Sequence, residues 1–184
     1  RGNGTLKSES STTFDGGNPA SSVSTNYAKD GSTVTDITST DFANATFDDE
    51  GNIATGYILS ETKRGNGTLK SESSTTFDGG NPASSVSTNY AKDGSTVTDI
   101  TSTDFANATF DDEGNIATGY ILSETKRGNG TLKSESSTTF DGGNPASSVS
   151  TNYAKDGSTV TDITSTDFAN ATFDDEGNIA TGYI

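Results

Sequence analysis

Residues 53–77, IATGYILSETKRGNGTLKSESSTTF, decide the fold of this chain. Two runs that suit β-strands flank Arg64-Gly65-Asn66-Gly67, and Asn-Gly between such runs is a strong signal for a β-hairpin. The same stretch joins two copies of one sequence, because residues 1–121 and residues 64–184 are identical. We therefore divide the chain into repeat 1 (1–63), repeat 2 (64–126) and a shortened repeat 3 (127–184). A hairpin at the junction predicts that antiparallel structure continues from one copy into the next.

Glycine, asparagine, aspartate and proline form four turn signals in each copy, because Gly and Asn accept positive φ and Asp bonds to nearby backbone. In the first copy they lie at residues 15–19, 29–32, 48–52 and 64–67. The runs between them are predicted strands, at residues 5–14, 20–27, 33–47 and 53–62. The third run is long and its apolar residues change parity, which predicts a bulge or break within residues 41–44. No run has helical spacing, so helix content should be close to nil.

The predicted fold class is all-β, with about four antiparallel strands per copy. Alternation gives each run a more apolar face, as in Ile53, Thr55, Tyr57 and Leu59. Leu, Ile, Val and Phe supply only ten of the 63 residues of a copy, so one copy alone should be marginally stable. We expect a continuous β meander or solenoid-like filament; the alternative is a string of small β-sandwich modules. The candidate sparse core is formed by four aromatic residues and their copies: Tyr27, Phe42, Phe47 and Tyr57.

The composition excludes several classes of function. The net charge of −15 repels nucleic acid and anionic lipid, and no apolar run is long enough for a membrane helix. The chain contains no His and no Cys, so it has no disulfide, no metal site built on those residues and no nucleophile–histidine pair. Paired carboxylates could still hydrolyse glycosides, but identical copies would offer three identical shallow sites with little apolar lining instead of one defined cleft, so we expect no catalysis. The lack of cysteine and the acidic surface favour an extracellular location, and the chain reads as a piece of a longer array.

The acidic turn of each copy is a candidate calcium site, because calcium prefers carboxylate and carbonyl oxygens. Its order of residues does not match an EF-hand loop, and solvated turn carboxylates are the alternative interpretation. Asp36 or Asp41 of the same copy could contribute further oxygens. No other cofactor is indicated. The candidate ligands are Asp48, Asp49, Glu50, Asp111, Asp112, Glu113, Asp174, Asp175 and Glu176.

Two Asn-x-Thr patterns per copy are acceptor sequences for N-linked sugars if the chain is exported. Their number is no more than this composition gives by chance. The candidate glycosylation residues are Asn3, Asn44, Asn66, Asn107, Asn129 and Asn170.

Two resemblances bear on function. The segment Phe47-Asp48-Asp49-Glu50-Gly51 resembles the aromatic-Asp-x-x-Gly turn of YD (RHS) repeats, which build β-hairpins that coil into shells. More broadly, the Thr-, Ser-, Asp- and Gly-rich, Cys-free, near-identical copies resemble tandem repeats of giant bacterial surface adhesins and extracellular filaments. That resemblance implies a structural segment of a filament or cell-surface stalk, whose partners are neighbouring repeats or other copies in a fibre. The alternative is an adhesin module that binds a glycan or protein receptor through avidity.

Overall fold

The computed structural model describes residues 4–174 and 178–183. The fold is all-β, with 67% of residues in strands and no helix in the described part of the chain. Consequently, the described residues include no helix that could cross a membrane. The chain forms two compact units, Arg1–Ile100 and Thr101–Ile184, and the boundary between them falls inside a strand.

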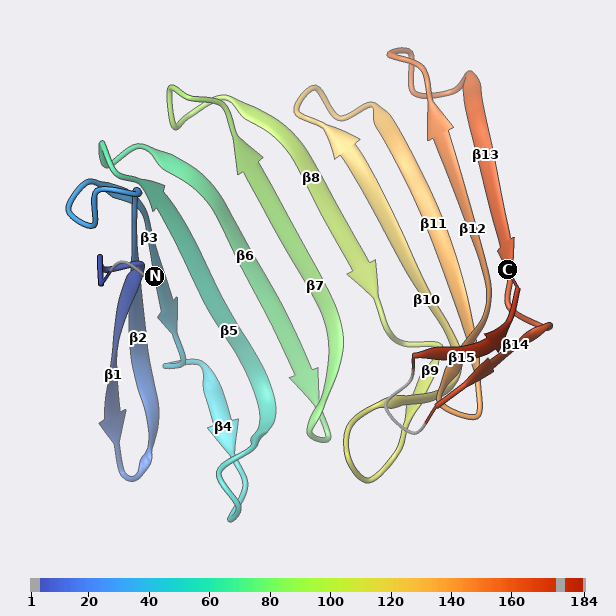
Figure 1. The fold of residues 1–184 in the computed structure, drawn as a ribbon, viewed down its shortest axis with the longest axis horizontal. Coiled ribbons are helices and arrows are strands. Elements are labelled where there is room, and N and C mark those ends of the chain that lie inside the picture. The colour runs from blue at the N-terminus through green and yellow to red at the C-terminus, as the bar shows by residue number, and fades with distance from the viewer. Residues whose placement is uncertain (1–3, 175–177, 184) are drawn as a thin grey trace. The chain divides into compact units, whose positions relative to one another are not determined.

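The first unit is an open antiparallel meander (Figure 1). Its hydrogen-bonded order is β1-β2-β3-β5-β6-β7-β8, and the short β4 pairs with the beginning of β5. The strands are β1 (Ser8–Asp15), β2 (Asn18–Tyr27), β3 (Val34–Asp41), β4 (Ala45–Phe47), β5 (Ile53–Arg64), β6 (Leu69–Asp78), β7 (Asn81–Tyr90) and β8 (Val97–Asp104), the last of which crosses the unit boundary.

In the second unit, β9 to β13 repeat β4 to β8 of the first unit 63 residues later. Its meander has the order β10-β11-β12-β13, with β9 beside β10, and β14 and β15 form a separate two-stranded sheet. The strands are β9 (Ala108–Phe110), β10 (Ile116–Arg127), β11 (Leu132–Asp141), β12 (Asn144–Tyr153), β13 (Val160–Asp167), β14 (Ala171–Phe173) and β15 (Ile179–Gly182).

The junction between repeats is a hairpin inside the sheet. Strands β5 and β6 pair with Ser60 opposite Ser73, and the Arg64 N–H donates to the Thr68 carbonyl at 2.8 Å. Gly67 completes the turn at φ 85°, a conformation that an L-residue adopts only with strain. Strands β10 and β11 form the same hairpin at the next junction. The predicted continuous meander is therefore confirmed at both junctions, and a hinge between sandwich modules is not found there.

The predicted break in the third run is also confirmed. Strand β3 ends at Asp41 and β4 begins at Ala45. Between them the Asp41 carboxylate accepts a hydrogen bond from the Ala43 N–H at 2.8 Å, and the Ala45 N–H donates to the Phe42 carbonyl at 2.9 Å. This tight turn lets one long run contribute two strands, both of which pair with β5.

The predicted aromatic core is wrong. No described residue is buried, and Tyr57 is 37% exposed. Tyr27, Phe42 and Phe47 are half-buried, and the rings of Phe42 and Phe47 lie 6.5 Å apart between centroids. Within each unit the principal strands form one hydrogen-bonded sheet, so the described side chains are flanked by neighbours on that sheet and are not enclosed. Stability must come mainly from the backbone ladder and from cross-strand side-chain pairs.

Candidate functional site

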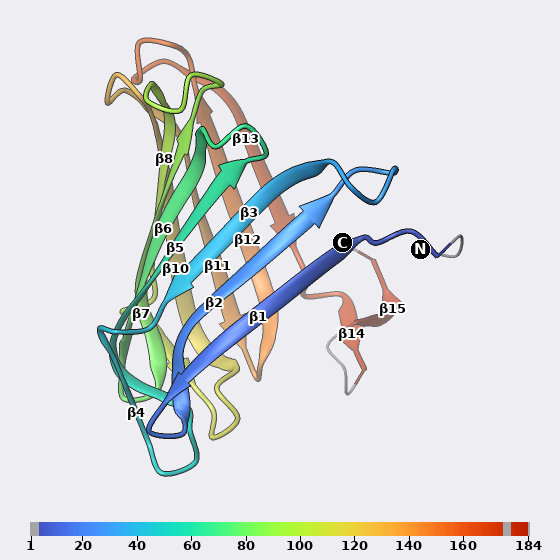
Figure 2. The ribbon, with the colours of Figure 1, turned by 90° about the vertical axis from the view of Figure 1, so that its left-hand side faces the viewer.

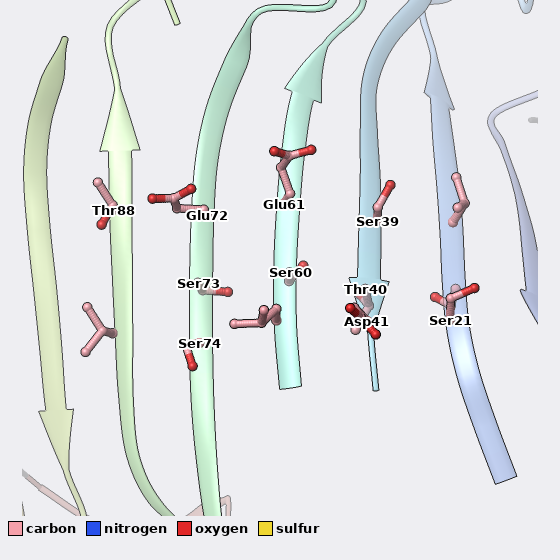
Figure 3. Close-up of a pocket in the computed structure, with 14 residues that line it drawn as sticks. Ser21, Ser39, Thr40, Asp41, Ser60, Glu61, Glu72, Ser73, Ser74 and Thr88 are labelled. Atoms are coloured by element: carbon pink, nitrogen blue, oxygen red, sulfur yellow. The ribbon is translucent and has the colours of Figure 1, made fainter. Parts of the chain in front are cut away.

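A groove of about 730 Å³ lies over β2, β3, β5, β6 and β7 of the first unit (Figure 3). Its lining combines eight hydroxyl residues, three aliphatic residues and three carboxylates: Ser21, Ser22, Ser39, Thr40, Ser60, Ser73, Ser74 and Thr88; Val23, Leu59 and Val86; Asp41, Glu61 and Glu72. Side chains alternate across a strand, so the register decides which of them share a face. The three aliphatic residues are 41–42% exposed.

One row of side chains crosses the groove from strand to strand. Val23 lies opposite Ser39, Ser39 opposite Glu61, Glu61 opposite Glu72, and Glu72 opposite Thr88. Figure 3 shows Glu61 and Glu72 on neighbouring strands and on the same face. Two carboxylates opposite each other on an antiparallel pair repel, which costs a few tenths of a kcal/mol to about 1 kcal/mol. The register therefore concentrates negative charge in the middle of the groove.

Neighbouring side chains moderate this charge. The Lys63 ammonium lies 2.6 Å from a Glu61 carboxylate oxygen, and the Tyr90 hydroxyl donates to Glu72 at 2.5 Å. The hydrogen bond to Glu72 raises the pKa of Tyr90 above 10.0, with desolvation and the Glu72 charge as smaller causes. Tyr153 makes the same bond to Glu135 in the second unit. The groove thus combines hydrogen-bond acceptors, hydroxyls and exposed aliphatic surface.

The opposite face of the sheet carries a row of small hydroxyl residues. In cross-strand order the row runs through Ser22, Thr40, Ser60, Ser73 and Ser87, of which the first four also belong to the groove lining although their side chains alternate with those of the groove row. In the adjacent row, the hydroxyls of Thr38 and Thr62 lie 2.9 Å apart, and those of Thr101 and Thr125 repeat the contact at 2.9 Å. Hydroxyl pairs of this kind link neighbouring strands on this face.

The acidic turns are built as hydrogen-bonded loops. Asp48 accepts bonds from the Glu50 and Asn52 N–H groups at 3.1 and 2.8 Å and from the Asn52 side-chain amide at 3.2 Å. The backbone bond from Asn52 is the largest cause that lowers the pKa of Asp48. Asp49 and Glu50 are exposed in the same turn.

The calcium prediction is not decided by this geometry. The turn of Asp111, Asp112 and Glu113 is built in the same way. Asp174 also accepts from Asn178, whereas Asp175 and Glu176 lie outside the described residues. Within residues 4–174 and 178–183, no group of three potential ligands converges on a metal position. A rise in melting temperature with calcium that Asp48→Asn reduces would support the prediction; equal temperatures in calcium and in chelator would contradict it.

The candidate glycosylation residues lie in turns on the surface. Asn44, Asn66, Asn107, Asn129 and Asn170 are exposed, and Asn3 lies outside the described residues. Asn66 is engaged locally, since its side-chain oxygen accepts from the Thr68 N–H and hydroxyl at 3.1 and 2.8 Å. The geometry leaves modification of these residues as a prediction.

The sequence analysis missed the groove, although part of its signal was present. Glu61 and Glu72 are equally far from the Asn66-Gly67 pair, so a simple hairpin centred on that pair already places them opposite each other. Their alignment with Val23, Ser39 and Thr88 depends on the registers of three further strand pairs. Those registers could not be derived from local pattern.

Comparison with known protein families finds no matching family, and comparison with curated proteins finds no match.

Proposed function

We propose that this chain is a structural segment of a long extracellular repeat filament or surface stalk, without catalysis. The observation that carries the proposal is the repeat junction. Strand β5 ends one copy and β6 begins the next, and they pair over eight positions from Gly56–Phe77 to Lys63–Leu69. Covalently linked copies that share a sheet at each junction form an array that is both long and stiff, as a stalk must be.

The surface supports the same proposal. The absence of buried residues among those described means that no copy has a separate core of its own. Each strand instead depends on the strands beside it, including those of the next copy. The net charge of −15 keeps such a segment soluble and opposes lateral association. Neighbouring repeats are therefore its principal partners, with an extracellular location as part of the proposal.

Thermal unfolding of chains with one, two and three copies tests this function. If the copies are coupled through their junctions, the melting temperature rises with copy number. A single copy that melts at the temperature of three would mean independent modules and would refute the structural proposal.

A second function, adhesion, is favoured by the groove. Its acceptors and hydroxyls surround the exposed aliphatic side chains of Val23, Leu59 and Val86, a surface suited to a glycan or a polar peptide. Repetition of the sequence would add avidity. Glu61→Lys should weaken retention on an immobilised glycan panel, whereas Glu50→Lys, in an exposed turn outside the groove lining, should leave it unchanged. Equal retention of both variants would argue against the groove.

A further inference from the structure

The turn at each repeat junction contains an asparagine followed by glycine. The five asparagines of a copy precede Gly, Pro, Tyr, Ala and Ile, so each copy contains this pair once. Among the described residues the pair occurs as Asn66-Gly67 and Asn129-Gly130, and all four residues are exposed. Figure 2 shows the first of these turns where β5 passes into β6.

An asparagine side chain can react with the backbone nitrogen that follows it. The Gly67 nitrogen loses its proton and forms a bond to Asn66 Cγ. The bond from Cγ to the side-chain nitrogen breaks, and that nitrogen leaves as ammonia with the proton. The resulting succinimide takes up one water molecule and opens to aspartate or isoaspartate. Glycine leaves the attacking nitrogen unhindered because it has no Cβ, whereas proline has no N–H to lose.

The junction turn holds the oxygen of the reacting amide between two donors. Asn66 Oδ1 accepts from the Thr68 N–H at 3.1 Å and from the Thr68 hydroxyl at 2.8 Å. Negative charge develops on this oxygen when the Gly67 nitrogen attacks, and donors already directed at developing charge lower the barrier. Asn129 Oδ1 accepts the same two bonds from Thr131, at 3.1 and 2.8 Å. Both junctions therefore have the same arrangement.

We propose that Asn66 and Asn129 are sites of spontaneous deamidation, and that the hydroxyls of Thr68 and Thr131 promote the reaction. Its reactants are the chain itself and water. The rate rises with pH, because the attacking nitrogen must first give up its proton. The modification is a property of the turn and does not rest on the proposed role as a stalk.

One contact of the turn opposes the reaction. The Gly67 N–H donates to the Arg64 carbonyl at 2.8 Å, and this bond must open before the nitrogen attacks. The surroundings permit local opening, since a Cβ added to Gly67 would meet no atom within 4 Å. Deamidation is therefore slow, and it accumulates as the chain ages.

The products change the junction. The succinimide nitrogen carries no hydrogen, so the bond from Gly67 to Arg64 is lost. Isoaspartate adds a CH₂ group to the backbone of a turn that is closed by the Arg64 N–H and the Thr68 carbonyl at 2.8 Å. Because loop length fixes hairpin register, the longer turn weakens the pairing of β5 with β6. Deamidation of Asn66 also removes the nitrogen to which an N-linked sugar would attach.

Incubation of the full chain in mildly alkaline buffer tests the proposal. Peptide mapping by mass spectrometry measures the acid formed at each asparagine, and enzymatic methylation detects isoaspartate. Asn66 and Asn129 should convert roughly tenfold faster than Asn44 or more, because the Cβ of Ala45 hinders the attacking nitrogen. Equal rates at the three residues would overturn the proposal.

Two reciprocal variants test the role of the threonines. Thr68→Val keeps the branched shape of the side chain and removes its hydroxyl. It should slow the conversion of Asn66 severalfold and leave Asn129 unchanged, and Thr131→Val should have the reverse effect. In concentrated urea, where the turns are lost, the valine and threonine chains should convert at equal rates.

Unchanged or faster conversion at the substituted turn, or a difference that persists in urea, would overturn the role of the folded turn. Circular dichroism and urea unfolding establish that both variants remain folded, and the unaltered junction in each chain is an internal control. The proposed function fails separately: melting temperatures independent of copy number would refute the stalk and leave the deamidation rates as they are.

Discussion

Gly56→Ala should be one of the most destabilising single substitutions in the first unit. Gly56 has φ +92°, and a Cβ built on it would lie 2.1 Å from the Asn44 carbonyl oxygen. The positive φ alone costs an L-residue about 1–2 kcal/mol. The carbonyl must also move away, which weakens its hydrogen bond from the Tyr57 N–H, now 3.1 Å, for about 1 kcal/mol more. Together with the strain of moving the backbone, the expected loss in the free energy of unfolding is about 3–4 kcal/mol.

Gly67→Ala is the matched control. Gly67 has a similar φ of +85°, but its added Cβ would meet no atom within 4 Å. Only the conformational cost applies, about 1–2 kcal/mol. Urea unfolding of the two variants followed by circular dichroism measures the difference, and the corresponding melting temperatures should differ by several degrees. If the two substitutions destabilise the chain equally, the close approach of Asn44 to Gly56 is not a real constraint.

Three further predictions follow from polar contacts. The pKa of Asp30 is lowered from 3.8 to about 2, chiefly by the side-chain hydrogen bond from Thr33. Its contribution to folding stability is therefore present above pH 4 and is lost as the pH falls toward 2. Asp30→Asn should reduce the change in urea midpoint across that window, and an unchanged midpoint profile would refute this assignment. Tyr90→Phe should remove one high-pH component from the phenolate absorbance titration, because the bond to Glu72 raises the pKa of Tyr90; an identical titration curve would count against that bond. Lys70→Ala should cost at most about 1 kcal/mol, since its ion pair with Asp36 at 2.8 Å is partly exposed, and the loss should shrink in 1 M salt. A loss that is independent of salt would point instead to packing of the lysine stem.

The turns and strand breaks of this protein could be predicted from its sequence alone. The exact copies and the Asn-Gly turn at Asn66 and Gly67 predicted the hairpin at the junction, and the structure contains it. The parity change before Ala45 predicted the break in the third run, which is also present. These features depend on the φ preferences and side-chain alternation of residues close in sequence. Such preferences act wherever the chain goes, so they can be read without the fold.

The tertiary structure was needed to show which residues lie opposite each other on neighbouring strands and which side chains are covered by their neighbours. The aromatic residues were expected to form a core, yet Tyr57 remains exposed because a one-layer sheet encloses nothing. The groove row that includes Glu61 and Glu72 arises from the registers between neighbouring strands. Register and coverage are set by hydrogen bonding between distant segments. Identical residues such as Phe14 and Phe77 therefore differ in exposure because their neighbours differ.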